Sequence, residues 1–138
     1  MKRCAPIERH PGVDETPGRR FARALAAKNR TALAEVLSTD VDFRGLTPGR
    51  SWEASGWTAV VDDIVLGHWF SDKDDIVELV STAESTMADR SHAAYRLLVS
   101  NPDGDFLVEQ QAYYQAEGDE ITWMRVLCSG YRPVRPPG

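Results

Sequence analysis

Two turn signals in the last third of the chain, Asn101–Gly104 and Glu117–Glu120, separate three long segments of strand-forming residues. Connections this short join antiparallel neighbours in a sheet. The first half of the chain instead carries apolar residues at helical spacing, so helices precede an antiparallel meander. That order predicts an α+β domain in which one curved sheet wraps a helical layer. Four main strands are expected, over residues 76–86, 93–100, 106–117 and 121–131.

Helical spacing marks two segments of the first half. In residues 18–37, Phe21, Leu25 and Leu33 fit one long helix or two short ones around a polar turn. Residues 57–70 place their apolar side chains on one face, which predicts an amphipathic helix. Between the two segments, we expect a short strand over residues 41–44 and a loop over residues 46–56.

The bulk composition indicates one globular domain. The 138 residues are 42% hydrophobic and 27% charged, which is typical of soluble proteins. Residues 1–17 contain several prolines and no hydrophobic period, so we expect a flexible N-terminal arm, a domain over residues 18–132 and a tail over residues 133–138.

Charge and cysteine content exclude several classes of protein. The net charge of −5 and pI near 5.2 disfavour binding to nucleic acid, which requires clustered Lys and Arg. The composition does not indicate a membrane protein. No apolar run follows the first charges, so no signal peptide is expected, and we predict a cytoplasmic location. The two cysteines, Cys4 and Cys128, do not form a disulfide framework and are expected to be thiols.

Four segments occur in a distinctive order: Phe21–Leu25 in the opening helix, Asp40–Phe43 in the short strand, Gly67–Phe70 at a helix end, and Glu117–Trp123 in the closing hairpin. In this layout the chain resembles the nuclear transport factor 2-like superfamily, which includes the SnoaL-like polyketide cyclases, ketosteroid isomerases and limonene-epoxide hydrolases. The resemblance covers most of the chain. It implies a cone-shaped half-barrel that helices close, a mostly apolar cavity, and a homodimer formed through the outer sheet face.

The resemblance does not carry one activity, because members of the superfamily build unrelated sites in the same cavity. The positions of the isomerase base, tyrosine and acid fall near Gly45, Ala24 and Gln111, and none of these has the isomerase side chain. The epoxide hydrolases need an Asp-Arg-Asp set, whereas Glu109 is the one acid expected to point inward from the later strands, and Arg125 falls on the outer face. A SnoaL-like cyclase needs an acid or a base near its substrate.

Polar residues alternate along the predicted strand 106–117. Glu109, Gln111 and Tyr113 share one face, and the register with Ile121 predicts that this face points inward. A carboxylate that is desolvated in an apolar cavity can exchange a proton near neutral pH, so Glu109 is a candidate general base or acid. The alternative is that Glu109 forms a structural ion pair with a neighbouring arginine such as Arg96 or Arg44, or faces solvent.

His68 falls on the same helical face as Val61 and Ile64, so we expect it to point toward the cavity and to assist Glu109. The alternative is a hydrogen-bonded histidine of the core. No two histidines have metal-ligand spacing, and neither a metal nor a cofactor is expected. The residues predicted to bind a ligand are Gln111, Tyr113, Trp52, Trp57, Tyr95, Met124 and Cys128, with Trp52 as a lid residue.

These patterns favour a SnoaL-like protein whose pocket binds a small hydrophobic or polycyclic molecule and catalyses a cofactor-free cyclisation or isomerisation by proton transfer. The alternative is a non-catalytic module of the same fold that binds a ligand or a partner protein. Trp123, Arg125 and Leu127 are expected on the outer face, where they fit the homodimer interface.

Overall fold

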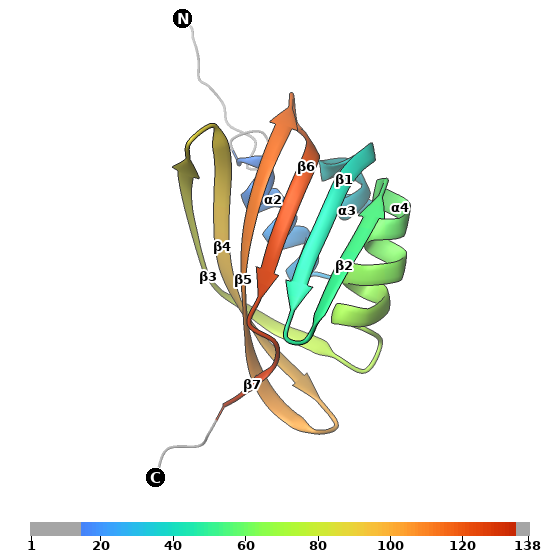
Figure 1. The fold of residues 1–138 in the computed structure, drawn as a ribbon. Helices are drawn as coiled ribbons and strands as arrows, with labels where there is room; N and C mark the ends of the chain where they lie inside the picture. The colour runs from blue at the N-terminus through green and yellow to red at the C-terminus, as the bar shows by residue number, and fades with distance from the viewer. Residues whose placement is uncertain (1–14, 135–138) are drawn as a thin grey trace, which may run out of the picture.

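The computed structural model describes residues 15–134. In this part of the chain a curved sheet packs against helices on one face (Figure 1). The elements are α2 (Pro17–Ala26), α3 (Arg30–Val36), β1 (Leu37–Thr47), β2 (Arg50–Ser55), α4 (Trp57–Ala59), the π-helix η1 (Val60–Trp69), β3 (Asp75–Met87), β4 (Arg90–Asn101), β5 (Gly104–Glu117), β6 (Glu120–Cys128) and β7 (Arg132–Pro133).

The sheet has seven strands in the order β2-β1-β6-β5-β4-β3, and β7 pairs with β5. Neighbouring strands are antiparallel, except that β1 and β6 are parallel. The meander β3-β4-β5-β6 is the one that the turn signals predicted. The predicted α+β fold, with a curved open sheet around N-terminal helices, is confirmed.

The first helical segment forms two short helices. Thr16 caps α2 by accepting a hydrogen bond from the Arg19 backbone at 3.2 Å, and Pro17 occupies the first turn, where its missing N–H costs nothing. Asn29 caps α3 in the same way, because its Oδ1 accepts a hydrogen bond from the Ala32 backbone at 3.0 Å. Helix α2 therefore begins at Pro17, the last residue of the predicted arm. Residues 1–14 of that arm, Cys4 among them, lie outside the described residues.

The predicted loop over residues 46–56 is wrong, because β1 and β2 form a hairpin there. Thr47 pairs with Arg50, which leaves Pro48 and Gly49 as the two turn residues. Gly49 has φ +78°, and a proline followed by a glycine at positive φ is typical of a type II turn. The turn signal was correct, but the alternation on both sides of it was missed.

The predicted helix over residues 57–70 exists, but most of it is the π-helix η1. Its last turn shows the wider spacing, because Phe70 donates from its backbone to Val65 five residues earlier, at 2.9 Å. Gly67 suits this geometry, since a Cβ there would lie 2.1 Å from the Asp62 carbonyl oxygen. The π-helical spacing moves side chains off the faces that an α-helical period predicts.

The core lies between the helices and the inner face of the sheet. Phe21 of α2 packs against Tyr95 of β4, with ring centroids 6.3 Å apart, and both side chains are almost fully buried. Phe43 of β1 packs against Trp69 of η1 at 5.8 Å. No helix in residues 15–134 has the length and apolarity needed to cross a membrane. The predicted last strand ends at Cys128, and the chain returns to the sheet as β7.

Candidate functional site

Three side chains form a row across the inner face of β4, β5 and β6. Gln110 is the cross-strand partner of Tyr95 on one side and of Cys128 on the other. Directly opposed residues in a sheet have Cβ atoms about 5 Å apart, so the three side chains are neighbours. We call Tyr95, Gln110 and Cys128 the inner polar row.

Gln110 has an incomplete set of hydrogen bonds. The Tyr95 hydroxyl donates to its Oε1 at 2.7 Å, while its Nε2 is buried and has no acceptor among the described residues. The whole side chain is only 1% exposed. A buried donor without a partner lowers the free energy of unfolding by about 1–3 kcal/mol, so its presence in a folded protein calls for an explanation. Because Tyr95 fixes Oε1, the amide presents its N–H groups to any group that enters.

Trp69 supplies a second buried donor without a partner. Its Nε1 has no acceptor in the described part of the chain. Its ring lies against Gly45, where a Cβ would come within 2.6 Å of the ring. Gly45 is paired with Val126 on β6, so Trp69 covers the inner face two strands from Gln110. Both orphan groups are neutral donors, and both suit a ligand that carries an acceptor oxygen.

A pocket of about 450 Å³ lies at the end of the sheet where the β4–β5 turn is found. Trp69, Phe106 and Tyr131 form its aromatic wall, and His68 and Asp74 contribute polar groups. This volume falls within the usual range of about 300–1,000 Å³ for small-molecule sites. We call it the open-end pocket.

Asp74 holds the rim of the open-end pocket in place. Its buried carboxylate accepts hydrogen bonds from the Ser71 backbone at 3.1 Å, from the Ser71 hydroxyl at 3.3 Å and from Asn101 Nδ2 at 2.9 Å. The Lys28 ammonium donates to the backbone carbonyls of Ser71 and Asp74. The loop after η1 is thereby fastened both to the β4 end and to the turn between α2 and α3.

Tyr131 lies between the open-end pocket and the inner polar row. Along β5, Cys128 lies level with Gln110 and Arg132 lies level with Leu107, so Tyr131 falls between these levels. Its ring contacts Phe106 at 5.5 Å, and its hydroxyl donates to the Trp69 carbonyl at 2.6 Å. Burial raises the pKa of Tyr131, and the nearby Asp74 raises it further.

His68 lies at the rim of the open-end pocket rather than inside the cone. Its side chain is exposed, so the expected inward orientation is wrong, and the π-helical spacing explains the difference. Nδ1 lies 3.0 Å from the Asp63 carbonyl oxygen, which can only accept, so Nδ1 is the donor, and in the neutral ring the lone pair then lies on Nε2. The ring packs against Trp52 at 5.2 Å.

Glu109 lies on the outer face of the sheet, so its predicted inward orientation is also wrong. It forms ion pairs with Arg96 at 2.6 Å and with Arg132 at 3.4 Å, and the Arg96 pair is the structural alternative that the sequence left open. The turn at Gly118–Asp119 pairs Ala116 with Ile121, which is buried. Cross-strand partners share a face, so even-numbered residues of β5 point inward.

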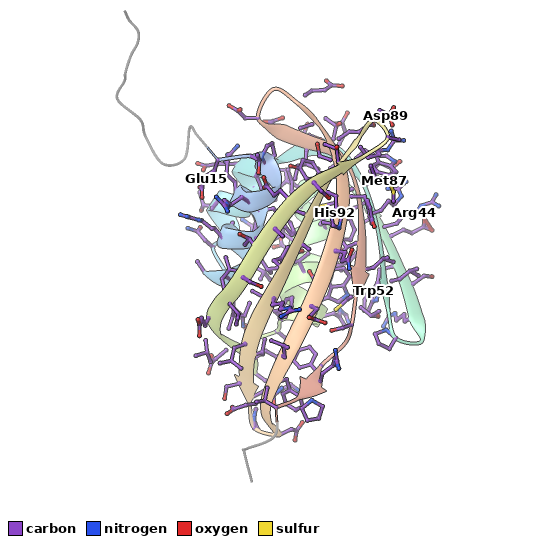
Figure 2. The ribbon with its side chains drawn as sticks, turned by 90° about the vertical axis from the view of Figure 1, so that its left-hand side faces the viewer. Glu15, Arg44, Trp52, Met87, Asp89 and His92 are labelled. Carbon is purple, nitrogen blue, oxygen red and sulfur yellow. The ribbon has the colours of Figure 1, made fainter. Side chains whose placement is uncertain are left out.

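The same one-residue slip applies to Gln111 and Tyr113, which were predicted to bind a ligand in the cavity. Both lie on the outer face. The His92 ring packs against Tyr113 at 4.7 Å, and its Nε2 lies 3.0 Å from Gln111 Oε1. Figure 2 labels His92 on β4, close to Met87 and Asp89 at the β3–β4 turn. The inward amide of β5 is therefore Gln110.

The other predicted ligand-binding residues divide into two groups. Tyr95, Met124 and Cys128 lie on the inner face, where the first two are almost fully buried and Cys128 is half-buried. Trp52 is a packed residue of β2 rather than a lid in a loop, because its Nε1 donates to Thr47 at 2.8 Å and its ring meets Trp69 edge-on. Trp57, the first residue of α4, lies under the guanidinium of Arg30 from α3, at 4.9 Å.

Gln110 was missed although the sequence contains a signal for it. Phe106, Val108, Ala112 and Tyr114 are apolar or aromatic residues of β5 that recur every second position, in register with Gln110. The apolar members of a strand mark its buried face, so Gln110 stands out as the polar exception on that face. Tyr131 and Asp74 have no comparable signal, because long-range packing determines their places.

Among residues 15–134, no three His, Cys, Asp or Glu side chains are grouped so that they could hold a metal ion. The inner polar row has a phenol, an amide and a thiol as its polar groups, and the deeply buried charged residue of the described part is Asp74 at the rim. The arrangement therefore offers hydrogen-bond donors to a neutral acceptor.

The burial of the Tyr95 hydroxyl predicts that the protein loses stability at alkaline pH. Burial raises the pKa of its hydroxyl above the ordinary value of about 10, and the nearby Cys128 adds to this. The stability that the raised pKa contributes is fully present below about pH 10 and is lost as the pH rises further, because the unfolded chain then releases the proton first. Urea titrations at a series of pH values should show this fall. Tyr95→Phe should flatten it, and an equally steep fall in that variant would contradict the assignment.

Replacing Glu109 by glutamine tests the outer placement. Surface ion pairs contribute about 0–1 kcal/mol, so Glu109→Gln should change the free energy of unfolding by less than about 1 kcal/mol. Arg96→Gln is the matched control, and the double variant should show a small coupling energy. A loss of several kcal/mol in urea denaturation would instead indicate a buried carboxylate.

Comparisons with known proteins identify the fold. No family model matches the chain, and no curated protein matches it by sequence. Solved structures do match in fold. A proposed isomerase from Bacillus subtilis has a TM-score of 0.68 at 13% identity and covers 82% of this chain and 84% of its own. A protein from Catenulispora acidiphila with a ketosteroid isomerase-like fold, solved with trimethylamine, has a TM-score of 0.62 at 14% identity, with 83% and 88% covered.

A proposed SnoaL-like polyketide cyclase from Mesorhizobium loti is also similar, with a TM-score of 0.59 at 14% identity, and the match covers 80% of this chain and 94% of that one. The chain has the fold of the nuclear transport factor 2-like superfamily, in which the SnoaL-like proteins are found. At these identities the similarity establishes the fold, and the activity must be argued from the site.

Proposed function

We propose that this protein binds a small, largely apolar molecule inside the cone and holds an acceptor oxygen of that molecule with the Gln110 amide. The observation that carries the proposal is the buried Nε2 of Gln110, which has no acceptor in the described chain. A site built to donate a hydrogen bond discriminates strongly against ligands that lack the acceptor, since its buried donor then stays unpaired. The ligand class is therefore a carbonyl or ether compound with an apolar body.

The route to Gln110 begins at the open-end pocket. Phe106 lines this pocket, and Gln110 lies four residues further along the same face of β5, or roughly 13 Å at the usual rise of a strand. Tyr131 stands between them, and its hydroxyl donates a hydrogen bond to the Trp69 carbonyl. Entry of a ligand therefore requires the Tyr131 ring to move aside.

A proton-transfer activity of the cyclase or isomerase kind is the second candidate, and His68 is the observation that favours it. In its neutral form, Nε2 is a base at the rim of the open-end pocket, because Nδ1 is committed to the Asp63 carbonyl. Replacing His68 by glutamine should abolish turnover of an enolisable ketone while leaving its affinity unchanged. Equal turnover by the variant would leave binding as the function.

Binding is tested with two probes that differ in one group. Acetylnaphthalene has a ketone oxygen, and ethylnaphthalene has the same aromatic body without it. Isothermal titration should give about tenfold tighter binding of the ketone, which corresponds to about one hydrogen bond. Equal affinities would show that Gln110 does not recognise the ketone oxygen. If neither probe binds, the proposed function is wrong.

We also propose a homodimer through the outer sheet face. Leu46 and Leu127 are cross-strand partners on that face and are 52% and 47% exposed. Trp123 lies on the same face between the guanidinium groups of Arg90 and Arg125, each 4.4 Å from its ring. Light scattering should find a dimer that Leu127→Glu dissociates, whereas Val77→Glu, at an exposed site on β3, should not. A monomeric parent protein would overturn this proposal.

A further inference from the structure

Cys128 is the one nucleophilic side chain in the inner polar row. It is half-buried, and Gln110 is its cross-strand partner on β5. The Gly130 backbone N–H points at its Sγ, with a distance of 3.4 Å. A thiol alone defines no site. Here, however, the Gln110 amide beside it is 1% exposed and has a donor nitrogen without an acceptor.

The two groups differ in chemistry and complement each other. A thiolate is a soft nucleophile, and an amide N–H stabilises an oxygen anion. One class of ligand presents the matching pair of atoms, namely an α,β-unsaturated ketone, whose β-carbon is electrophilic and whose oxygen becomes negative when the β-carbon is attacked. This step rests on the proposed function, because it uses the same acceptor oxygen at Gln110.

We propose that Cys128 adds covalently to an enone held in the cone, so that the inner polar row is a modification site for conjugated carbonyl compounds. The thiol gives its proton to solvent water, and a sulfur lone pair forms a C–S bond at the β-carbon. The electrons of the C=C bond form a new double bond between the α-carbon and the carbonyl carbon, the π electrons of the C=O bond move to the oxygen, and the Gln110 amide donates to the resulting enolate. A proton from water then returns to the α-carbon. The sum is addition of S–H across C=C without oxidation or reduction.

The Tyr95 hydroxyl is a positioning group in this reaction. It donates to Oε1 of Gln110, which prevents the amide from turning its oxygen toward the enolate. Burial raises the pKa of Tyr95, so this donor stays protonated at neutral pH. Tyr95→Phe should therefore slow the addition without removing it, and Gln110→Met should slow it more.

The experiment uses the full chain with Cys4→Ser, which leaves Cys128 as the single thiol. The probe is benzylideneacetone, and intact-mass spectrometry follows its addition. A single adduct is expected, mapped by peptide digestion to Cys128, with a rate above that of free glutathione. Cys128→Ser should give no adduct. No adduct, or a rate no higher than that of glutathione, would overturn the proposal.

A second comparison separates recognition by the amide from simple access to the thiol. An aromatic disulfide reagent also reacts with Cys128 but forms no enolate. Gln110→Met should lower the enone rate by about 100-fold or more, the effect of removing one oxyanion donor, while the disulfide rate stays within a few-fold. Equal slowing of both reactions would contradict the role of Gln110.

The saturated ketone benzylacetone distinguishes this inference from the proposed function. If benzylacetone binds and perturbs Gln110 but the enone forms no adduct, the covalent step is wrong and the binding function stands. If benzylacetone does not bind and the enone forms no adduct, both proposals are wrong. Adduct formation together with binding supports both.

Discussion

Phe21→Ala is expected to lower the free energy of unfolding by about 3–5 kcal/mol, the usual cost of removing a fully buried aromatic ring. Phe21 is 1% exposed and packs against Tyr95, so it connects α2 to the inner face of the sheet. Because Thr16 and Pro17 already define the start of α2, the loss would come from the core rather than from helix formation. Urea denaturation monitored by circular dichroism measures it.

The control for this prediction is a substitution on an exposed helical position. Glu35→Ala in α3 should change the free energy of unfolding by no more than about 0.5 kcal/mol. Since small domains have a total stability of about 5–15 kcal/mol, Phe21→Ala should leave little folded protein in mild urea. A change below about 1 kcal/mol would show that α2 does not close the cone as described.

The Gln110 side chain should lower the free energy of unfolding and raise the affinity for a ketone ligand. The double variant Tyr95→Phe with Gln110→Met removes both partners of the 2.7 Å hydrogen bond and also removes the orphan Nε2. Replacing both partners by apolar groups of similar shape is close to neutral or stabilising, so its free energy of unfolding should equal or exceed that of the parent. Its affinity for acetylnaphthalene should fall about tenfold, which is the loss of one hydrogen bond.

The single variant Gln110→Met gives the matched comparison. It leaves the Tyr95 hydroxyl buried without its acceptor, so it should be less stable than the double variant by about 1–3 kcal/mol. Ethylnaphthalene should bind to the parent and to both variants alike. Weaker binding of ethylnaphthalene by the variants would mean that they disturb the pocket as a whole, and unchanged binding of the ketone would remove Gln110 from the site.

The sequence predicted the architecture because its strongest signals are local. The turns at Asn101–Gly104 and Glu117–Glu120 mark hairpins, and hairpin strands are antiparallel neighbours whatever surrounds them. Helical spacing likewise located α2 and α3. The β1–β2 hairpin was missed because Pro48 and Gly49 were interpreted as signs of a loop, although they form a tight turn.

The prediction of the site depended on which face of β5 points inward, and an error of one residue in the register exchanges the two faces. Counting from the turn placed Glu109 inside, whereas the pairing of Ala116 with Ile121 places Gln110 there. A register shift between Gln115 and Ala116 also lets Ile121 and Met124 both face the core. The predicted inward orientation of His68 was also wrong, because it assumed an α-helical period in a segment that forms a π-helix.

Recognition of a ketone by Gln110 can be observed in the amide spectrum of isotopically labelled protein during titration with acetylnaphthalene. We expect the side-chain N–H signals of Gln110 to move downfield as the ketone oxygen accepts their hydrogen bond, and ethylnaphthalene to leave them in place. Saturable binding of the ketone without any movement of the Gln110 signals would contradict the central claim that this buried amide recognises the ligand.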